Sequence, residues 1–185
     1  MEDASKAVAR LVTEPIERAA TVGSPGSQAG TPGKALKSLF GRAKRESGIG
    51  VRNVLVLTPT AIRVFACNAR GAHAVAEREV AAWPRDAVRI EAVTGEQWSA
   101  FNASHSGSVT NRFYVITLIP IGDGPRIELE CPRTDSARAT IQAIEDATGS
   151  PPSKITARRR TKQASAHAAD AARDLAGGGS PDPAR

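Results

Sequence analysis

Residues 54–67 read VLVLTPTAIRVFAC, two short apolar runs separated by a Thr-Pro-Thr turn. Proline presets one turn dihedral and has no backbone donor for a β-ladder, so it separates two strands rather than lying inside one. In the second run Arg63 alternates with Ile62 and Val64, as expected of a strand with one solvated face. The segment therefore predicts a β-hairpin.

The residues that follow repeat this pattern of strands and turns. Asn68-Ala-Arg-Gly71 is typical of a hairpin turn, because Asn and Gly tolerate positive φ. Alternating or continuous apolar runs predict further strands at 73–83, 87–93, 113–121 and 126–131. Between them, residues 97–103 are compatible with another strand, and residues 104–111 predict a polar loop.

A single helix is predicted to close this region. Thr134 or Asp135 is expected at its N-cap, and Gly149, followed by two prolines, is expected at its end. Ala137, Ile141 and Ile144 share one face of this helix. The predicted fold is mainly β with helices, an antiparallel barrel of six to seven strands capped by a C-terminal helix.

Residues 50–149 resemble bacterial pleckstrin-homology-like (PH-like) domains. The resemblance rests on Val54–Phe65 as the opening hairpin, on Glu79–Val88 as the link between the third and fourth strands, and on Gly122–Glu130 as the closing hairpin before the helix. It implies a platform that binds peptides, protein domains or lipids, and no catalytic activity. The phosphoinositide-binding members carry several Lys and Arg around the first hairpin turn. Here only Arg52 and Arg63 lie near that turn, so the resemblance implies a protein partner.

The flanks of this region carry the positive charge. The chain has a formal net charge of +6, whereas residues 51–149 contain ten Arg and eleven acidic residues. Residues 1–22 predict an amphipathic helical extension, with a break near Pro15. A Gly/Ser/Pro-rich linker follows at 23–33. The two cysteines, Cys67 and Cys131, are not spaced as metal ligands and are expected to be reduced and buried.

Residues 34–49 predict a basic helix, regular over 34–46, with two alternative roles. Its apolar side chains either pack on the barrel or enter an anionic membrane surface, which the cations would attract. In the second case the candidate contact residues are Lys34, Lys37, Phe40, Arg42, Lys44 and Arg45.

Residues 150–185 predict a disordered, basic, Ala-rich tail. The tail is either a solubilising extension or a weak, sequence-independent nucleic-acid contact. In the second case the candidate phosphate contacts are Arg158, Arg159, Arg160 and Lys162.

Trp83 and Arg85 are the candidate contacts for a protein partner. Trp83 precedes a Pro-Arg corner, where the alternative is that it only closes the core. Trp and Arg dominate the energetics of protein interfaces, so an exposed Trp-Pro-Arg corner would favour partner binding.

The sequence predicts no catalytic site, no cofactor and no metal. The histidines are scattered, and no nucleophile elbow or phosphate-binding loop is present. The expected function is a non-catalytic adaptor module that binds a protein partner, with no small-molecule substrate. Peripheral membrane association and nucleic-acid binding are the alternatives. No secretory signal is seen, which predicts a cytoplasmic protein, or one on the inner face of the membrane if the basic helix binds lipid.

Overall fold

One antiparallel sheet organises the molecule. A computed structural model describes residues 2–25, 48–70, 73–98 and 110–157. The seven strands lie in the order β4-β3-β2-β1-β7-β6-β5. Their bounds are β1 Arg18–Gly23, β2 Arg52–Leu57, β3 Ala61–Arg70, β4 His73–Pro84, β5 Val88–Trp98, β6 Thr110–Pro120 and β7 Ile127–Pro132. The prediction of a mainly β fold with helices is confirmed.

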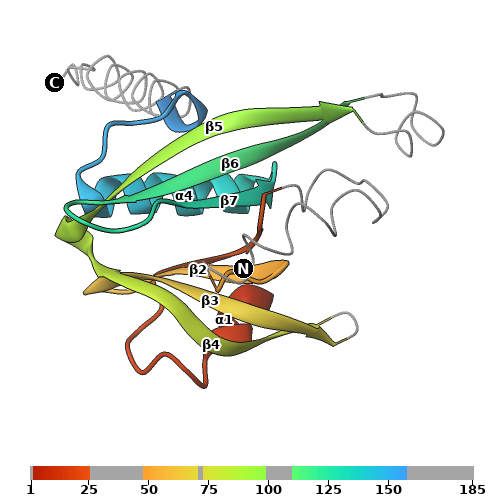
Figure 1. Ribbon diagram of the computed structural model, residues 1–185, viewed down its shortest axis with the longest axis vertical. Helices are drawn as coiled ribbons and strands as arrows, with labels where there is room; N and C mark the ends of the chain where they lie inside the picture. The colour runs from red at the N-terminus through yellow and green to blue at the C-terminus, as the bar shows by residue number, and fades with distance from the viewer. Residues whose placement is uncertain (1, 26–47, 71–72, 99–109, 158–185) are drawn as a thin grey trace, which may run out of the picture.

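The two halves of the sheet face each other across the core (Figure 1). The sheet is not closed, so the predicted barrel is wrong in that respect: β4 and β5 are the two ends of the strand order and do not pair. They are joined at a corner by the 3-10 turn η1 (Arg85–Ala87) and diverge from it. The core between the halves is aliphatic and includes Leu55, Ile62, Val64, Ile90, Ile116 and Leu129.

Helix α4 (Asp135–Thr148) packs on this core, at the position predicted for the closing helix. Thr134 is its N-cap, and the Thr134 hydroxyl accepts a hydrogen bond from the Ala137 amide at 3.1 Å. Gly149 ends it with φ +65°, in the left-handed region that glycine adopts without a steric penalty. Ile141 and Ile144 are fully buried.

The prediction of helix over residues 1–22 is correct only at the start. Helix α1 spans Glu2–Val8, whereas residues 18–23 form β1, which pairs with β2 from Arg18↔Leu57 to Gly23↔Arg52. Gly23 also pairs with Glu130 of β7. The N-terminal segment is therefore not an extension of the sheet but supplies its central strand.

Helix α1 and the residues after it cover the outer face of the first half of the sheet. Ala4 and Val8 pack with Val54, Val56 and Phe65 in a second apolar cluster, separate from the main core. The apolar face of α1 is thus occupied by the chain itself and is not available to a partner.

Ion pairs hold residues 9–17 in place. The Glu14 carboxylate accepts hydrogen bonds from the Thr60 hydroxyl at 2.5 Å and from the Arg63 guanidinium at 2.7 Å. These contacts, the Thr60 bond first, hold the pKa of Glu14 below its usual value. Arg63 also pairs with Glu79 of β4 at 2.8 Å, so one guanidinium links this segment to two strands.

The prediction of a disordered tail from residue 150 is wrong for its first residues. Residues 154–157 are helical, and Ile155 belongs to the main core. The cause is Glu145, a fully buried carboxylate on α4. Its oxygens accept hydrogen bonds from the Ser153 amide at 3.0 Å and from the Thr156 hydroxyl at 2.6 Å, which fix the chain against the helix.

Both cysteines are free thiols, with Cys131 buried and Cys67 partly buried. Burial raises the pKa of Cys131 to about 12 from an ordinary 9.0, and the thiolate is the reactive form. We expect iodoacetamide at about pH 8 to leave Cys131 unmodified in the native protein and to alkylate it in denaturant, as measured by mass spectrometry.

The same shift gives a pH dependence of stability. The pKa of Cys131 is higher in the folded state than in the unfolded state. The shift therefore does not change the free energy of unfolding well below pH 9.0, and it lowers that free energy increasingly as the pH rises from 9.0 towards 12.

In the alkylation experiment, rapid modification of Cys131 in the native protein would contradict its burial.

Candidate binding surfaces

The sequence-predicted contact residues fall into two groups. Among the described residues are Trp83 and Arg85, at the β4–η1 corner. Outside them lie the membrane candidates Lys34, Lys37, Phe40, Arg42, Lys44 and Arg45, and the nucleic-acid candidates Arg158, Arg159, Arg160 and Lys162. The linker at 26–33 also lies outside.

At the corner, both candidate residues have structural contacts. Trp83 is partly buried and packs against the main core. Arg85 donates to the carbonyl oxygen of Thr58 from Nε at 2.8 Å and from Nη2, and it pairs with Glu17 at 2.6 Å. Arg85 therefore ties the N-terminal segment to the β2–β3 turn. Partner contact at this corner stays a prediction.

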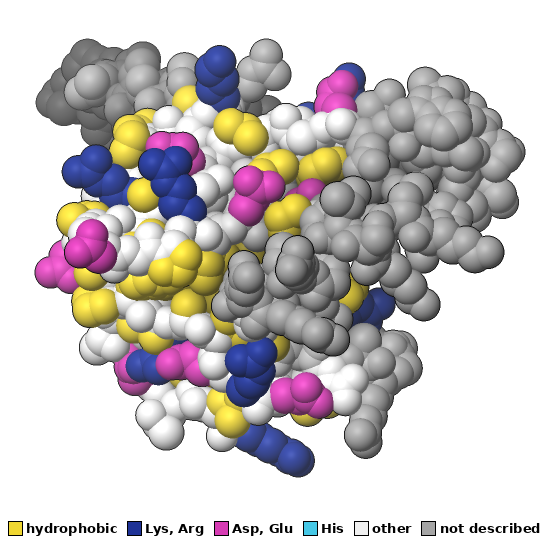
Figure 2. Space-filling model, in the orientation of Figure 1, with side chains coloured by type: hydrophobic (Ala, Val, Ile, Leu, Met, Phe, Trp, Pro, Cys, Tyr) yellow, Lys and Arg dark blue, Asp and Glu magenta, His cyan; other side chains and the backbone are white. Residues whose placement is uncertain are grey.

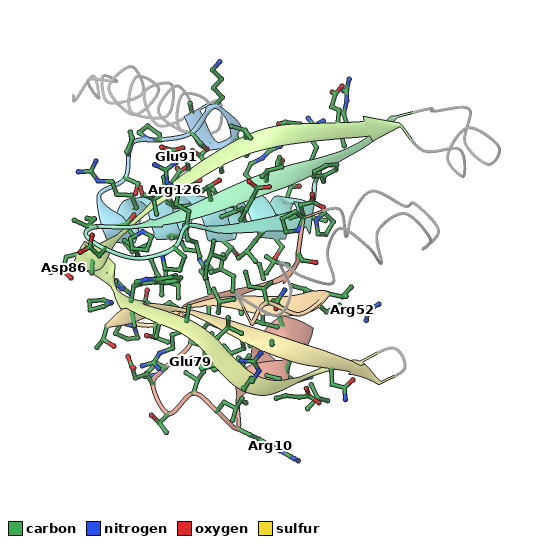
Figure 3. The ribbon with its side chains drawn as sticks, viewed as in Figure 1. Arg10, Arg52, Glu79, Asp86, Glu91 and Arg126 are labelled. Atoms are coloured by element: carbon green, nitrogen blue, oxygen red, sulfur yellow. The ribbon has the colours of Figure 1, made fainter. Side chains whose placement is uncertain are left out.

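Three segments of the chain leave the sheet at the same end. The strand ends Gly23 and Arg52, Arg70 and His73, and Trp98 and Thr110 all lie there (Figure 1). Since Gly23 pairs with Arg52, residues 24–51 depart from and return to a single point of this end. Arg52 points outwards there (Figure 3). The sequence of the basic segment 34–45 is thus inserted within the sheet domain rather than attached in front of it.

A groove of about 480 Å³ lies beside this point and carries mixed charge. Its lining includes Arg52, Cys67, Glu77 and Arg78, together with residues 48–51. Arg78 donates to the carbonyl oxygen of Gly48 at 2.7 Å, so its guanidinium is partly engaged by the groove wall. With an acid and two arginines in the lining, the groove has no single electrostatic preference.

Strand β5 lies at one end of the strand order, so one of its backbone edges is not paired with another strand. Each residue of an antiparallel strand directs its N–H and C=O to the same side, and the side alternates along the strand. The Ala87 carbonyl accepts from Ile121 beyond the β6 end, whereas the Ile90 amide donates to Ser150 Oγ at 3.0 Å on the opposite side. The even-numbered residues of β5 therefore direct their backbone groups away from β6.

Beyond Ile90, this edge is open within the described part of the chain. No hydrogen bond there joins the outward N–H or C=O groups of Ala92, Thr94 and Glu96 to another element. On the outer face Val93 is 58% exposed. The Glu96 side chain pairs with Arg112 of β6 and so does not cover the edge. An open, partly apolar strand edge is a template for a further strand.

The opposite edge, β4, is less suited to accept a strand. Its register with β3 shifts twice, between Val64 and Phe65 and between Ala66 and Cys67. Such bulges twist an edge and interrupt its hydrogen-bonding row, and the exposed Glu77, Arg78 and Glu79 add charge beside it. Of the two edges, β5 is therefore the better docking strand.

Charge on the face shown in Figure 2 is dispersed. On the face shown in Figure 2, Lys and Arg side chains are interspersed with Asp and Glu, and no large area of one sign is present among the described residues. Among the same residues, no group of His, Cys, Asp and Glu has the arrangement of a metal site, and no helix is long and apolar enough to cross a membrane.

Comparison with known proteins adds no family. Neither a protein-family model nor a curated protein nor a solved structure matches the chain. Its function is therefore inferred from its own residues.

Proposed function

We propose that this protein is a non-catalytic interaction module of the PH-like kind, and that a segment of a protein partner binds by adding a strand to the free edge of β5. The observation that carries the proposal is the run of outward backbone groups at Ala92, Thr94 and Glu96, which lack a partner within the described chain. Strand addition would pair these groups with those of the partner, and Val93 would offer an apolar contact on the outer face.

Two further features support a protein partner. Seven antiparallel strands followed by a closing helix is the order expected of a PH-like domain. The dispersed charge on the described face favours a protein over a membrane or a nucleic acid, because those polyanionic surfaces are bound by extended areas of positive charge (Figure 2). The membrane and nucleic-acid alternatives rest on segments 34–46 and 158–162, outside the described residues.

The proposal is tested by removing one edge donor. Thr94→Pro eliminates the outward N–H without breaking a bond to β6, and proline is tolerated at such edge positions. Thr94→Ala is the matched control, because it removes the side chain and keeps the N–H. We expect Thr94→Pro to lose at least tenfold in affinity for a captured partner while Thr94→Ala stays within about threefold.

Amide hydrogen exchange supplies the second readout. In the free protein the Thr94 and Glu96 amides should exchange faster than those of Val93 and Gly95, which face β6. Binding of the partner should protect them. Equal affinity of the two Thr94 variants, with no protection on β5, would refute strand addition.

A further inference from the structure

A second feature of the molecule is a positively charged pocket of about 540 Å³, which shares Thr94 with the β5 edge. It lies where the inner face of β5 and β6 meets the start of α4 and residues 154–157. Its polar lining consists of Thr94, Tyr114, Arg133, Arg138 and Lys154, and Ile155 and Ala157 complete it.

Among the described residues, the lining contains three cations and no acidic side chain. Arg133 and Lys154 are exposed, and neither makes an ion pair or hydrogen bond within the described chain. Elsewhere on the described surface several arginines are neutralised by carboxylates, as Arg63 is by Glu14 and Arg112 by Glu96. Three cations that converge without such a partner leave a local excess of positive charge.

Tyr114 orients the third cation and adds a donor. Its side chain is almost completely buried, with 1% exposed, while its hydroxyl reaches the pocket wall. The phenolic oxygen accepts hydrogen bonds from Arg138 Nε at 3.2 Å and Nη2 at 2.9 Å. An oxygen that already accepts two bonds has its own proton left to donate. The Arg138 guanidinium keeps Nη1 for a ligand, with its carbon 6.0 Å from the Tyr114 ring centroid.

We infer that this pocket binds a ligand through a phosphate group. Guanidinium, ammonium and phenol groups are all donors here, and a phosphate monoester offers three acceptor oxygens with a charge of about −1.5 to −2 at neutral pH. The planar guanidinium group of an arginine can donate two parallel hydrogen bonds to phosphate oxygens, which the ammonium group of a lysine cannot do. A monocarboxylate would neutralise only one of the three cations.

The test is a titration of the full-length, isotope-labelled protein with glycerol phosphate, followed by NMR. We expect saturable chemical-shift changes at the amides of Thr94, Tyr114 and Ile155. Acetate should bind at least tenfold more weakly, because it has one charge and a planar carboxylate instead of a tetrahedral phosphate group. Sedimentation with vesicles that contain phosphatidic acid identifies the source, because the same phosphate monoester is then presented by a membrane. Pelleting that the double variant Arg133→Gln/Lys154→Gln abolishes assigns the pocket to a lipid headgroup, and pelleting that is absent or unchanged in this variant assigns it to a soluble phosphate ester.

Variants locate the binding. The double variant Arg133→Gln/Lys154→Gln removes two exposed cations from the pocket and should weaken glycerol phosphate at least tenfold. The matched control, Arg89→Gln/Arg126→Gln, removes the same charge at two exposed arginines that do not line the pocket and should stay within twofold. Equal weakening in both doubles, or shifts confined to residues outside the pocket, would overturn the inference.

Discussion

Deletion of residues 1–33 is expected to abolish cooperative folding. β1 is the central strand of seven: it pairs with β2 along its whole length, and its end pairs with β7. The deletion would remove the buried side chains of Ala19, Ala20 and Val22, and with α1 it would expose the outer apolar cluster around Phe65. A domain is stabilised by only about 5–15 kcal/mol, so loss of a middle strand exceeds what the remainder tolerates. Thermal unfolding followed by circular dichroism would show no sigmoidal transition.

A peptide complementation experiment makes this result specific. A synthetic peptide of residues 2–25, added to the chain that begins at residue 34, should restore a cooperative transition. The same peptide with Val22→Asp should not, because it would bury a charge in the main core, where Val22 is 1% exposed. If the shortened chain alone unfolded cooperatively at the wild-type temperature, β1 would be dispensable and the strand order would be in error.

Replacement of Glu145 by alanine is expected to destabilise the fold by about 3 kcal/mol. The change removes a fully buried carboxylate, leaves the Ser153 amide without its acceptor and leaves the Thr156 hydroxyl with its longer bond to the Ser153 carbonyl oxygen at 3.2 Å. A buried polar group that loses its hydrogen-bond partner costs about 1–3 kcal/mol, because it stays desolvated. The cost is about 3–5 kcal/mol where a buried ion pair is broken. Urea unfolding monitored by fluorescence would measure the difference.

Two further variants define the origin of this loss. Glu128→Ala removes an exposed carboxylate from β7 and should change the stability by no more than about 0.5 kcal/mol. Thr156→Val tests the coupling between Thr156 and Glu145. In the double variant with Glu145→Ala, the two losses of unfolding free energy should be strongly non-additive, since both substitutions remove the same hydrogen bond. Additive losses would show that Glu145 does not act through residues 153–156.

The sequence predicted those elements whose signals are local. The strand that became β2, the Thr-Pro-Thr turn and helix α4 were all anticipated, because alternation, proline and the Thr134 and Gly149 caps act within a few residues. β5 was expected to end at Val93 but continues to Trp98. The reason is Gly95: a Cβ there would lie 2.5 Å from the Phe113 ring, so this glycine allows close packing within a strand rather than a turn.

β1 was missed because its sequence favours the wrong element. Ala19 and Ala20 have high helical propensity, and alanine is depleted in strands. Here small side chains are needed, because Ala19 packs in the outer cluster and Ala20 in the main core. This burial on both faces is set by residues distant in the sequence, so no local pattern indicates it.

The candidate site was missed for a related reason. Thr94, Tyr114, Arg138 and Lys154 come from two strands, a helix and the segment after it, and only the fold brings them to one pocket. The single signal in the sequence was Lys154, which follows the double proline. The composition of residues 150–185 predicted that this lysine belongs to a disordered tail. The open β5 edge was likewise hidden, since the strand order decides which strands lie at the ends of the sheet.

The central position of β1 also sets the order in which the sheet can form during synthesis. Its partner β2 ends at Leu57, but its other neighbour, β7, begins only at Ile127. At about 5–20 residues per second, the ribosome takes several seconds to make the chain between them. During that interval the nascent chain can complete only the half made of β1 to β4, and Gly23 lacks its partner Glu130. Final assembly of the sheet therefore waits for β7 and α4.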